Sequence, residues 1–283
     1  MKKLKMPTKA ETLVILKNKQ KKLNIIIPEI YYFTKKDYQK NKNKILQKIK
    51  KTFKNKKIIL RSSSTLEDQE NLTNAGKYKS YQNISPGSES VDEKINLIIS
   101  DFENDRDQII AQEFISSPDI SGVIFTRNIN NNSPYYFLNI DKSGRTDLIT
   151  SGKSNPSMKT LVFFRNIKKY KIDTKYKKLL ISIQKIENLF FNDRLDIEFC
   201  IKKSKIFIFQ CRPLKRLNEI NDTDIESALV SMTMKIEKLK KNNPFVIGQT
   251  TSFSNMADWN PAEMIGNRPT NLSMSLYSEL ITD

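Results

Sequence analysis

The sequence of 283 residues contains no histidine and only two cysteines. Without histidine, the chain itself cannot form a Ser–His–Asp triad, a histidine metal site or a phosphohistidine. Two cysteines do not make a disulfide scaffold. Cys200 and Cys211 fall out of register in the hairpin that the sequence predicts, so we expect no disulfide between them. Any chemistry must therefore use carboxylates, lysine, arginine, amides or hydroxyls, or a residue supplied from elsewhere.

Long apolar runs are also missing from the sequence. None approaches the roughly 20 residues of a membrane-spanning helix, and Ile25–Ile27 is cut at once by Pro28. The basic N-terminus is not followed by the apolar stretch of about 7–15 residues that marks a secretory signal. With 38% hydrophobic and 28% charged residues, the composition is typical of a soluble globular protein. The cytoplasm is the expected location.

The net charge of +18 is concentrated near the N-terminus. Residues 1–57 hold 19 lysines, no arginine and three acidic residues. These lysines are spread through helix-like stretches and are not gathered with arginines and stacking aromatics, as they are in many nucleic-acid-binding surfaces. The pattern favours a solvated basic face, with an anionic partner such as nucleic acid or a membrane as the alternative.

The pattern along the chain alternates helices and strands. The expected helices cover residues 9–21, 36–53, 90–102, 176–190 and 223–241, and the expected strands cover residues 57–61, 108–115, 121–126, 135–141, 160–165, 196–201 and 206–211. Two helix starts read as capping boxes, Ser90 with Glu93 and Thr223 with Glu226. Residues 256–283 have helical spacing and read as the start of a further domain, so we expect the front part of a longer protein or a truncated gene product.

One segment suits phosphate binding. Arg61 ends a predicted strand, hydroxyl residues from Ser62 to Thr65 follow, and a small-residue loop contains Gly76. The arginine offers a forked cation, and the loop offers backbone N–H groups that can approach an anion closely. The alternative is a polar connection with a surface arginine.

Two neighbouring strands carry a second candidate site. Asp196 and Glu198 are two residues apart in a predicted strand, so their side chains share one face. Gln210 and Arg212 share a face of the partner strand in the same way. If the hairpin aligns the two faces, one site holds two carboxylates, an amide oxygen and an arginine, which suits magnesium and a triphosphate. The alternative is a solvated strand face.

The strand-like segment at residues 109–114 is interrupted by Gln112 and Glu113. Such a segment can bind an adenine edge through its backbone and a ribose through a carboxylate. It can equally be an ordinary strand crossing the surface.

In order and spacing, these segments resemble the N-terminal ATP-grasp (PEP/pyruvate-binding) domain of the phosphoenolpyruvate synthase and pyruvate phosphate dikinase family. The likeness covers about residues 5–215 and is carried by residues 61–68, 75–76, 81–84, 111–114, 121–126, 196–198 and 210–213. Lys9 resembles the family's phosphate-binding lysine, although Pro7-Thr8 replaces the usual preceding glycines. Residues 144–147 are a degenerate match to a Gly-Leu-Gly-Glu stretch. The tail, at residues 256–266 and 275–280, resembles an L-glutamine kinase-like subgroup of capsule polysaccharide synthesis.

The resemblance implies an α+β fold, an ATP-grasp-like two-lobed nucleotide-binding domain with a helical C-terminal extension. It places the N-terminal lobe with its phosphate loop at residues 1–103, the C-terminal lobe with the adenine and metal sites at 104–216, and a linker with the incomplete start of a substrate domain at 217–283. The implied catalytic residues are Arg61, Arg212 and Lys9; the implied nucleotide-binding residues are Gln112, Glu113, Phe114, Ser62, Gly76 and Asp196; the implied magnesium ligands are Glu198 and Gln210.

The resemblance also implies a divided mechanism with ATP and Mg²⁺ as cofactors. ATP would pass a phosphoryl group to a histidine on a separate swivelling domain, present in the same protein or in another, and AMP and phosphate would be released. A small molecule such as L-glutamine or pyruvate would be the acceptor. This chain has no histidine, so we expect no full turnover by the chain alone. A non-catalytic nucleotide-binding module or gene remnant is the alternative, and a nucleic-acid binder is a third reading.

Overall fold

The computed structural model describes residues 6–64, 80–141, 158–165, 172–214, 222–240 and 265–282. The expected contributions of Gly76 and of residues 144–147 lie outside this part of the chain. The chain forms two compact units, Met1–Ile225 and Glu226–Asp283. The described strands all belong to the first unit, where they form two antiparallel sheets.

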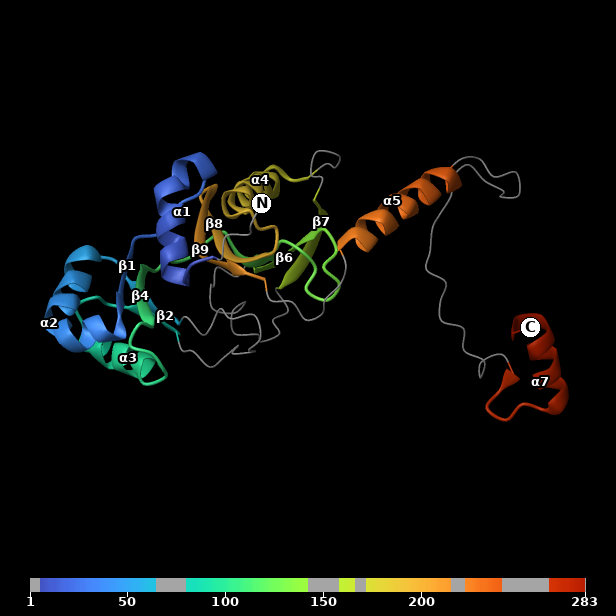
Figure 1. Ribbon diagram of the computed structural model, residues 1–283, viewed down its shortest axis with the longest axis horizontal. Helices are drawn as coiled ribbons and strands as arrows, with labels where there is room; N and C mark the ends of the chain where they lie inside the picture. The colour runs from blue at the N-terminus through green and yellow to red at the C-terminus, as the bar shows by residue number, and fades with distance from the viewer. Residues whose placement is uncertain are drawn as a thin grey trace. The chain divides into compact units, whose positions relative to one another are not determined.

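The first sheet has four strands in the order β1-β4-β2-β3. Its strands are β1 (Ile30–Thr34), β2 (Ile58–Ser63), β3 (Ser80–Ile84) and β4 (Gln108–Glu113). Helices α2 (Lys35–Thr52) and α3 (Ser90–Ile99) pack against this sheet (Figure 1). The helices bury Ile49 and Ile95 against Leu60 of the inner strand β2. This apolar core fixes which face of β2 and β4 points away from the helices.

The second sheet has five strands in the order β7-β6-β5-β8-β9. Its strands are β5 (Ile120–Phe125), β6 (Tyr135–Asp141), β7 (Lys159–Phe164), β8 (Leu195–Lys202) and β9 (Lys205–Pro213). Helices α1 (Lys9–Leu23) and α4 (Thr174–Phe190) pack on it (Figure 1). Leu13 and Leu16 of α1 share one core with Ile183 of α4 and Ile208 of β9.

The two sheets interleave along the sequence. Helix α1 precedes the whole four-stranded sheet but packs against the five-stranded one, whereas β4 pairs with β1 and β2. The expected division between residues 103 and 104 therefore does not coincide with the sheets. Thr8, the N-cap of α1, joins them, because its Oγ1 donates to Gln108 Oε1 of β4 at 2.8 Å.

The α+β class expected from the sequence is confirmed, and most predicted elements lie within a few residues of their observed bounds. Strands β1 and β3 were not predicted. The capping box expected at Ser90 is wrong: Ser90 is already helical, and the N-cap Glu89 makes no side-chain cap bond. Reciprocal capping boxes are found instead at Thr8 with Glu11 and at Thr34 with Asp37.

The two cysteines are free and buried. In the β8–β9 hairpin Cys200 lies opposite Phe207, and Cys211 lies opposite Ile197. The expected absence of a disulfide between the two cysteines agrees with this register. Burial raises the pKa of the Cys200 thiol to about 12, so it is protonated at neutral pH.

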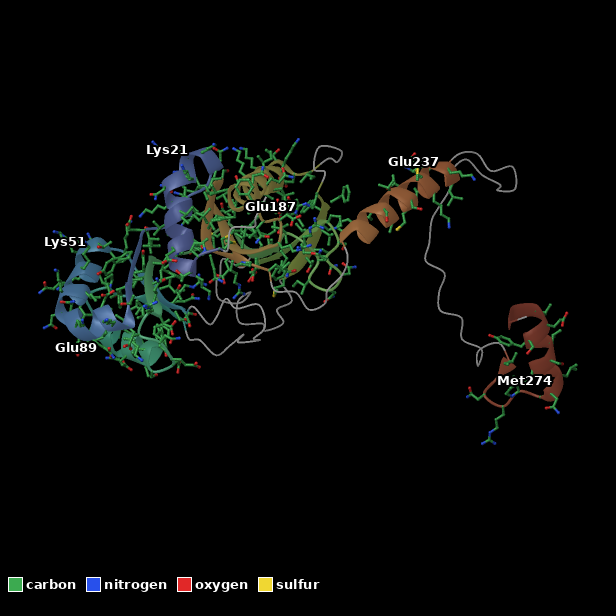
Figure 2. All side chains as sticks on the ribbon, viewed as in Figure 1. Lys21, Lys51, Glu89, Glu187, Glu237 and Met274 are labelled. Atoms are coloured by element: carbon green, nitrogen blue, oxygen red, sulfur yellow. The ribbon has the colours of Figure 1, made fainter. Side chains whose placement is uncertain are left out.

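The lysine-rich helices expose their charges. Lys21 of α1 and Lys51 of α2 are both exposed (Figure 2). Helix α2 has a single acidic residue, Asp37, in its sequence. Its lysines form the basic face that the composition predicts.

Helix α5 (Asp222–Leu239) runs across the boundary between the units, and α7 (Asn271–Tyr277) continues into the short π-helix η2 (Ser278–Thr282). These elements form the helical C-terminal extension. The side chains of the capping box expected at Thr223 and Glu226 lie outside the described residues. Among the helices that the structure describes, none combines the length and apolar character needed to cross a membrane.

Candidate functional site

The β8–β9 hairpin brings together four of the predicted site residues. Asp196 lies directly opposite Arg212, and Glu198 lies directly opposite Gln210. Because the residues of such cross-strand pairs point to the same face, and so do residues two apart, all four side chains share one face of the hairpin. Arg212 donates to Asp196 Oδ2 from Nε at 2.8 Å and from Nη2 at 2.7 Å. The two-carboxylate face expected from the sequence is thus present.

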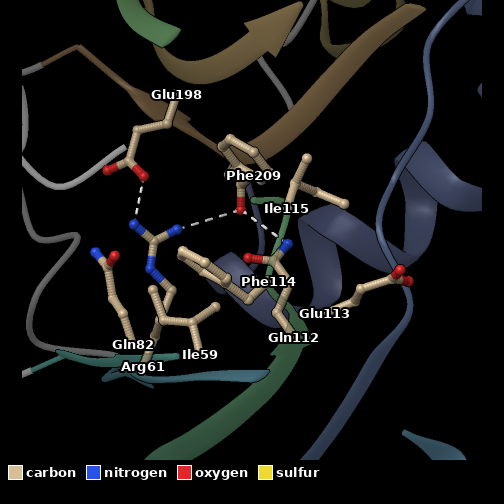
Figure 3. A pocket seen from close by; sticks show the side chains of 9 residues that line it. All are labelled: Ile59, Arg61, Gln82, Gln112, Glu113, Phe114, Ile115, Glu198 and Phe209. Atoms are coloured by element: carbon tan, nitrogen blue, oxygen red, sulfur yellow. Dashed lines mark hydrogen bonds and ion pairs between the residues drawn. The ribbon is translucent and has the colours of Figure 1, made fainter. Parts of the chain in front are cut away.

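A β-bulge interrupts this hairpin next to Glu198. Glu198 pairs with Gln210, but the following residue, Phe199, pairs with Ile208, so Phe209 is an extra residue in β9. The carbonyl oxygen of Phe209 accepts from Gln112 Nε2 at 3.3 Å and from Arg61 Nη1 at 3.5 Å (Figure 3). The bulge therefore turns a backbone acceptor of the five-stranded sheet toward two side chains of the four-stranded sheet.

Arg61 connects the two sheets a second time. Its guanidinium Nη2 donates to Glu198 Oε2, forming an ion pair between β2 and β8 (Figure 3). The two side chains are 15% and 14% exposed. They line a pocket at the junction of the sheets, whose other lining residues are Ile59, Gln82, Gln112, Glu113, Phe114, Ile115 and Phe209. We call this junction, with the carboxylate face of the hairpin, the interlobe site.

Lys9 lies at the edge of the same site. It is the first residue of α1 and is 6% exposed. The positive charge of Lys9 acts to lower the pKa of both Asp196 and Glu198, in opposition to burial, which indicates that Lys9 lies close to both carboxylates. The next residue, Ala10, donates its backbone N–H to Ser63 Oγ of β2 at 3.3 Å. The start of α1 is thereby held against the end of β2, two residues beyond Arg61.

The two carboxylates are affected differently by their surroundings. Burial raises the pKa of Asp196 above its ordinary value, against the opposing charge of Arg212. Burial also acts to raise the pKa of Glu198, but the combined effect of Arg61, Arg212 and Lys9 outweighs it, and the pKa falls below the ordinary value. Glu198 is therefore the firmly ionised member of the pair.

Two predicted nucleotide-binding side chains point away from the face that carries Arg61. Ser62 alternates with Arg61 in β2 and shares its face with Leu60, which packs under α2 and α3. Glu113 pairs with Lys56 at 2.8 Å and accepts from the backbone N–H of Glu29 at 3.4 Å. In Figure 3 its carboxylate is directed away from Glu198 and Arg61. The structure therefore brings Gln112, but not the carboxylate of Glu113, to the charged part of the site.

The backbone after Gln112 is partly engaged in the sheet. The N–H of Glu113 donates to Glu29 O, and the N–H of Phe114 donates to Lys57 O, both at 2.8 Å. Phe114, which the resemblance implies as a nucleotide-binding residue, lines the pocket together with Ile115. Gln82 of β3 belongs to the segment 81–84 that carries the family resemblance, but it was not assigned a role from the sequence; it lies beside Arg61 (Figure 3).

The oxygen atoms on the hairpin face determine which metal ion it could hold. In the described part of the chain, no group of three or more His, Cys, Asp or Glu side chains could hold a metal. Asp196, Glu198 and the Gln210 amide together supply only oxygen donors. Such a set fits Mg²⁺, which one or two carboxylates hold together with substrate phosphates and water. It does not fit a metal that needs a complete protein cage.

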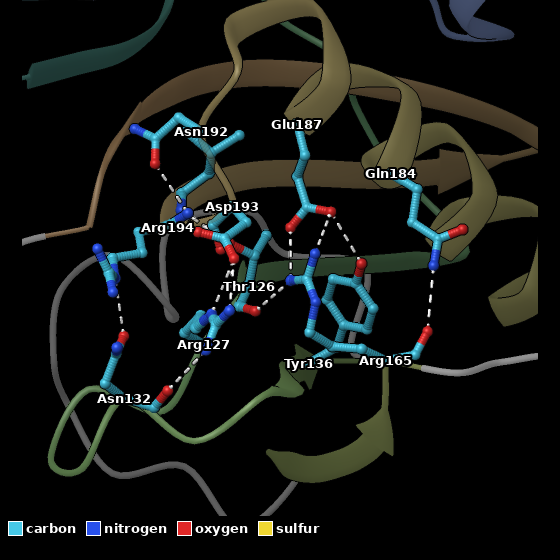
Figure 4. Close-up of polar contacts among 11 residues, drawn as sticks. Thr126, Arg127, Asn132, Tyr136, Arg165, Gln184, Glu187, Asn192, Asp193 and Arg194 are labelled. Carbon is cyan, nitrogen blue, oxygen red and sulfur yellow. Dashed lines mark hydrogen bonds and ion pairs between the residues drawn. The ribbon is translucent and has the colours of Figure 1, made fainter. Parts of the chain in front are cut away.

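A buried ionic cluster lies at the C-terminal end of α4 (Figure 4). Arg165 donates to both carboxylate oxygens of Glu187 at 2.8 Å, and Tyr136 Oη donates to Glu187 Oε2 at 2.9 Å. Glu187 is 4% exposed, and burial raises its pKa against the opposing effect of Arg165. The fork ties α4 to the ends of β6 and β7.

The same cluster holds the start of β8. Arg127 pairs with Asp193, whose carbonyl accepts from Thr126 Oγ1 at 2.7 Å. That hydroxyl in turn accepts from the N–H of Leu195 at 2.7 Å (Figure 4). Because Leu195 immediately precedes Asp196, these bonds position the strand that carries both carboxylates.

Comparison with known proteins gives a distant structural likeness only. No family model and no curated protein matches the chain. The D-alanine–D-alanine ligase of Helicobacter pylori superposes with a TM-score of 0.42 at 13% identity, covering 80% of this chain and 58% of the ligase. The macrocyclase MdnC of Microcystis aeruginosa, solved with its precursor peptide MdnA, gives 0.42 at 10% identity, covering 78% and 61%.

The VanG D-Ala:D-Ser ligase of Enterococcus faecalis has a TM-score of 0.37 at 13% identity, covering 72% of this chain and 50% of the ligase. The ligases among these structures have the ATP-grasp fold. The chain spans less than two thirds of the length of the first two proteins. Because these TM-scores are low, the superpositions carry no functional argument. The function proposed below rests on the side chains of the interlobe site.

Proposed function

We propose that this chain binds a magnesium complex of ATP in the interlobe site and is the ATP-binding part of an ATP-grasp phosphotransferase. The observation that carries the proposal is the meeting of Arg61 with the hairpin face of Asp196, Glu198, Gln210 and Arg212. Residues from two different sheets converge on one small volume with three buried or half-buried carboxylate and amide groups and two guanidinium groups. A purely structural ion pair does not need this concentration of charge.

Each side chain has a role that follows from its chemistry. Glu198 and the Gln210 amide would hold Mg²⁺, with Asp196 supporting them and kept in place by Arg212. Arg61, Arg212 and Lys9 would bind phosphate oxygens, and arginine suits this because its fork matches two oxygens at once. Bound Mg²⁺ would supply neutralisation of charge on the transferred phosphoryl group.

The base of the nucleotide would lie toward the apolar side of the pocket. Ile59, Phe114 and Ile115 provide apolar contacts there, and Gln112 provides a polar side chain. The N–H groups of Glu113 and Phe114 already donate within the sheet. Backbone recognition of an adenine edge would therefore use their carbonyl groups or the backbone of Ile115.

The acceptor chemistry is the finer part of the proposal. It rests on the family resemblance of the sequence, which implies transfer to a histidine of a swivelling domain and then to a small molecule such as L-glutamine. None of the 283 residues is a histidine, so that residue would come from outside this sequence. The chain alone would bind the nucleotide without completing the cycle.

A calorimetric titration tests the nucleotide site. The chain is titrated with a non-hydrolysable ATP analogue, with and without Mg²⁺, alongside Arg212→Ala and Glu198→Ala. We expect magnesium-dependent binding that both variants weaken by about tenfold or more, since each loses a charge-assisted contact. Arg106→Ala, which removes an exposed arginine before β4, is the matched control and should bind as the wild type does. A folded chain that binds no nucleotide, or binding that neither variant changes, would overturn the proposal.

Addition of a histidine-bearing swivelling domain tests the finer claim. Formation of AMP from ATP in the mixture, lost in Arg212→Ala, is the expected result. Binding of ATP without AMP formation with any such domain would identify a nucleotide-binding module and contradict the phosphotransferase assignment.

A further inference from the structure

In the structure, both arginines of the interlobe site are paired with the carboxylates of that site. Arg61 is paired with Glu198 between the sheets, and Arg212 is paired with Asp196 across the hairpin. The first pair differs from the second in what it joins. Its partners lie 137 positions apart in the sequence and belong to different sheets. Separating them would remove a contact between the two halves of the first unit.

The two residues of the Arg61–Glu198 pair are also those that would bind the metal and a phosphate group: Glu198 the metal, and Arg61 the phosphate. A phosphate group that binds Arg61 Nη2 displaces the Glu198 carboxylate from it, and a cation that binds Glu198 Oε2 displaces the Arg61 guanidinium. Either ligand alone leaves one charged partner at a site where both side chains are about 85% buried. An unpaired charge at such a site is strongly disfavoured. A metal–nucleotide complex avoids this, because it gives the carboxylate a cation and the guanidinium an anion in one step.

Resting on the proposed function, we propose that the Arg61–Glu198 pair is an interlobe latch that selects metal-bound over metal-free nucleotide. The latch holds the two sheets together until a divalent cation and a polyphosphate replace both of its partners at once. The Phe209 carbonyl supports the latch, because it accepts from the same guanidinium and from Gln112. Glu198 therefore has two functions, as a metal ligand and as a competitor that keeps bare phosphate away from Arg61.

The charge of Lys9 strengthens the selection. Lys9 acts on Glu198 in the same direction as Arg61 does. When Glu198 is made neutral, both cations act on an incoming phosphate without a competing carboxylate. Loss of the Glu198 charge should thus raise the affinity for metal-free ATP and lower the affinity for Mg²⁺–ATP.

Binding of ATP to the full chain in EDTA and in Mg²⁺ tests the latch, with wild type and Glu198→Gln compared by calorimetry. We expect Glu198→Gln to bind metal-free ATP about tenfold more tightly than wild type and Mg²⁺–ATP more weakly. Glu93→Gln removes one negative charge from an exposed position of α3. It controls for net charge and should change neither affinity by more than about twofold.

A reciprocal variant tests the other partner without using nucleotide. Arg61→Gln frees Glu198, so Mn²⁺ alone should bind this variant about tenfold more tightly than the wild type, as measured by electron paramagnetic resonance of free Mn²⁺. This measurement decides the question if Glu198→Gln does not fold.

The outcomes separate the two proposals. Suppose that the wild-type chain binds Mg²⁺–ATP. If Glu198→Gln then shows no increase in affinity for metal-free ATP, or Arg61→Gln shows no increase in affinity for Mn²⁺, the latch is overturned and the proposed nucleotide site stands. Folded wild-type chain that binds neither form of ATP overturns both.

Discussion

The Gln112 side chain donates from Nε2 to the carbonyl oxygen of Phe209 at 3.3 Å, joining the inner strand β4 of the four-stranded sheet to the edge strand β9 of the five-stranded sheet. Gln112 is 1% exposed. Phe209 is the extra residue of a bulge, so its carbonyl oxygen is turned out of the β8–β9 ladder. A departure from regular pairing thus provides the acceptor that holds two sheets in register around the interlobe site.

Replacement of Gln112 by leucine should destabilise the first unit. The variant keeps most of the buried volume but removes the donor, leaving the Phe209 carbonyl with the longer bond from Arg61. We expect the free energy of unfolding in urea to fall by about 1–3 kcal/mol, the cost of an unmade buried hydrogen bond. Gln47→Leu, at an exposed position of α2, should change it by less than about 0.5 kcal/mol. Equal stability of the two variants would show that the contact between the sheets does not depend on this bond.

Strand alternation alone predicts that Asp196 and Glu198 share one face of β8 and that Gln210 and Arg212 share one face of β9. The alignment of the two faces could not be predicted from the turn at Lys203 and Ser204. Regular pairing from that turn would put Asp196 opposite Cys211, and the bulge shifts the register so that Asp196 lies opposite Arg212. The bulge at Phe209 has no glycine or proline to mark it, so its carbonyl could not be foreseen.

The contacts between the sheets could not be predicted in this way. Arg61 was singled out as a phosphate-binding cation, but nothing near it in sequence indicates that it would pair with Glu198. Glu113 was expected to bind the ribose. In the structure its carboxylate forms an ion pair with Lys56, which lies just before β2. The Arg61–Glu198 pair depends on how the two sheets meet, and the Lys56–Glu113 pair depends on the pairing of β2 with β4. The hydrophobic pattern of the individual strands specifies neither.

The fork between Arg165 and Glu187 should make a large contribution to stability. Glu187→Ala leaves the Arg165 guanidinium and the Tyr136 hydroxyl without the acceptor that both now share. Breaking one partner of a buried ion pair costs about 3–5 kcal/mol, and we expect a loss of this size in urea unfolding. Glu237→Ala, which removes an exposed glutamate on α5, is the matched control. A loss below about 1 kcal/mol in Glu187→Ala would show that the cluster is open to water.

Acid should weaken the packing of α2 against α3 through Asp92. Lys42, at 2.7 Å, and Tyr38, whose hydroxyl donates at 2.6 Å, hold the pKa of Asp92 below its ordinary value. An unfolded aspartate titrates at about 3.9, so the stabilisation is present above that pH and is lost as the pH falls through the lower folded value. Asp92→Asn should lower the free energy of unfolding by about 1 kcal/mol at pH 7, a small amount because the pair is partly exposed.

The pH dependence distinguishes this charge effect from a packing defect. The stability difference between wild type and Asp92→Asn should narrow between pH 5 and pH 3, whereas Asp105→Asn, at an exposed loop position, should show little difference at either pH. A difference that is the same at both pH values would contradict the assignment to the charge of Asp92.

Gly122 has a structural explanation in the packing of β5. A Cβ atom added at this position would lie 2.6 Å from the backbone oxygen of Asn139 in β6 and 3.0 Å from the ring of Phe199 in β8. The first contact is with backbone and cannot be relieved by a rotamer change. Gly122→Ala should therefore lower the free energy of unfolding by about 1–3 kcal/mol. Gly87→Ala, where the nearest atom is the mobile end of Lys50 at 3.4 Å, should be nearly neutral.

Gly122→Ala should also change the geometry of the interlobe site. Phe199 follows Glu198 in β8, and Glu198 pairs across the sheet with Val123, the neighbour of Gly122. Displacement of Phe199 would move the Glu198 carboxylate relative to Arg61 and to Gln210. Because such a site needs its groups held within about 0.5 Å, Gly122→Ala should weaken Mg²⁺–ATP binding at temperatures where the variant is still folded, as measured by calorimetry. Unchanged binding in a destabilised Gly122→Ala variant would show that the strain is absorbed by β6 and does not pass to β8.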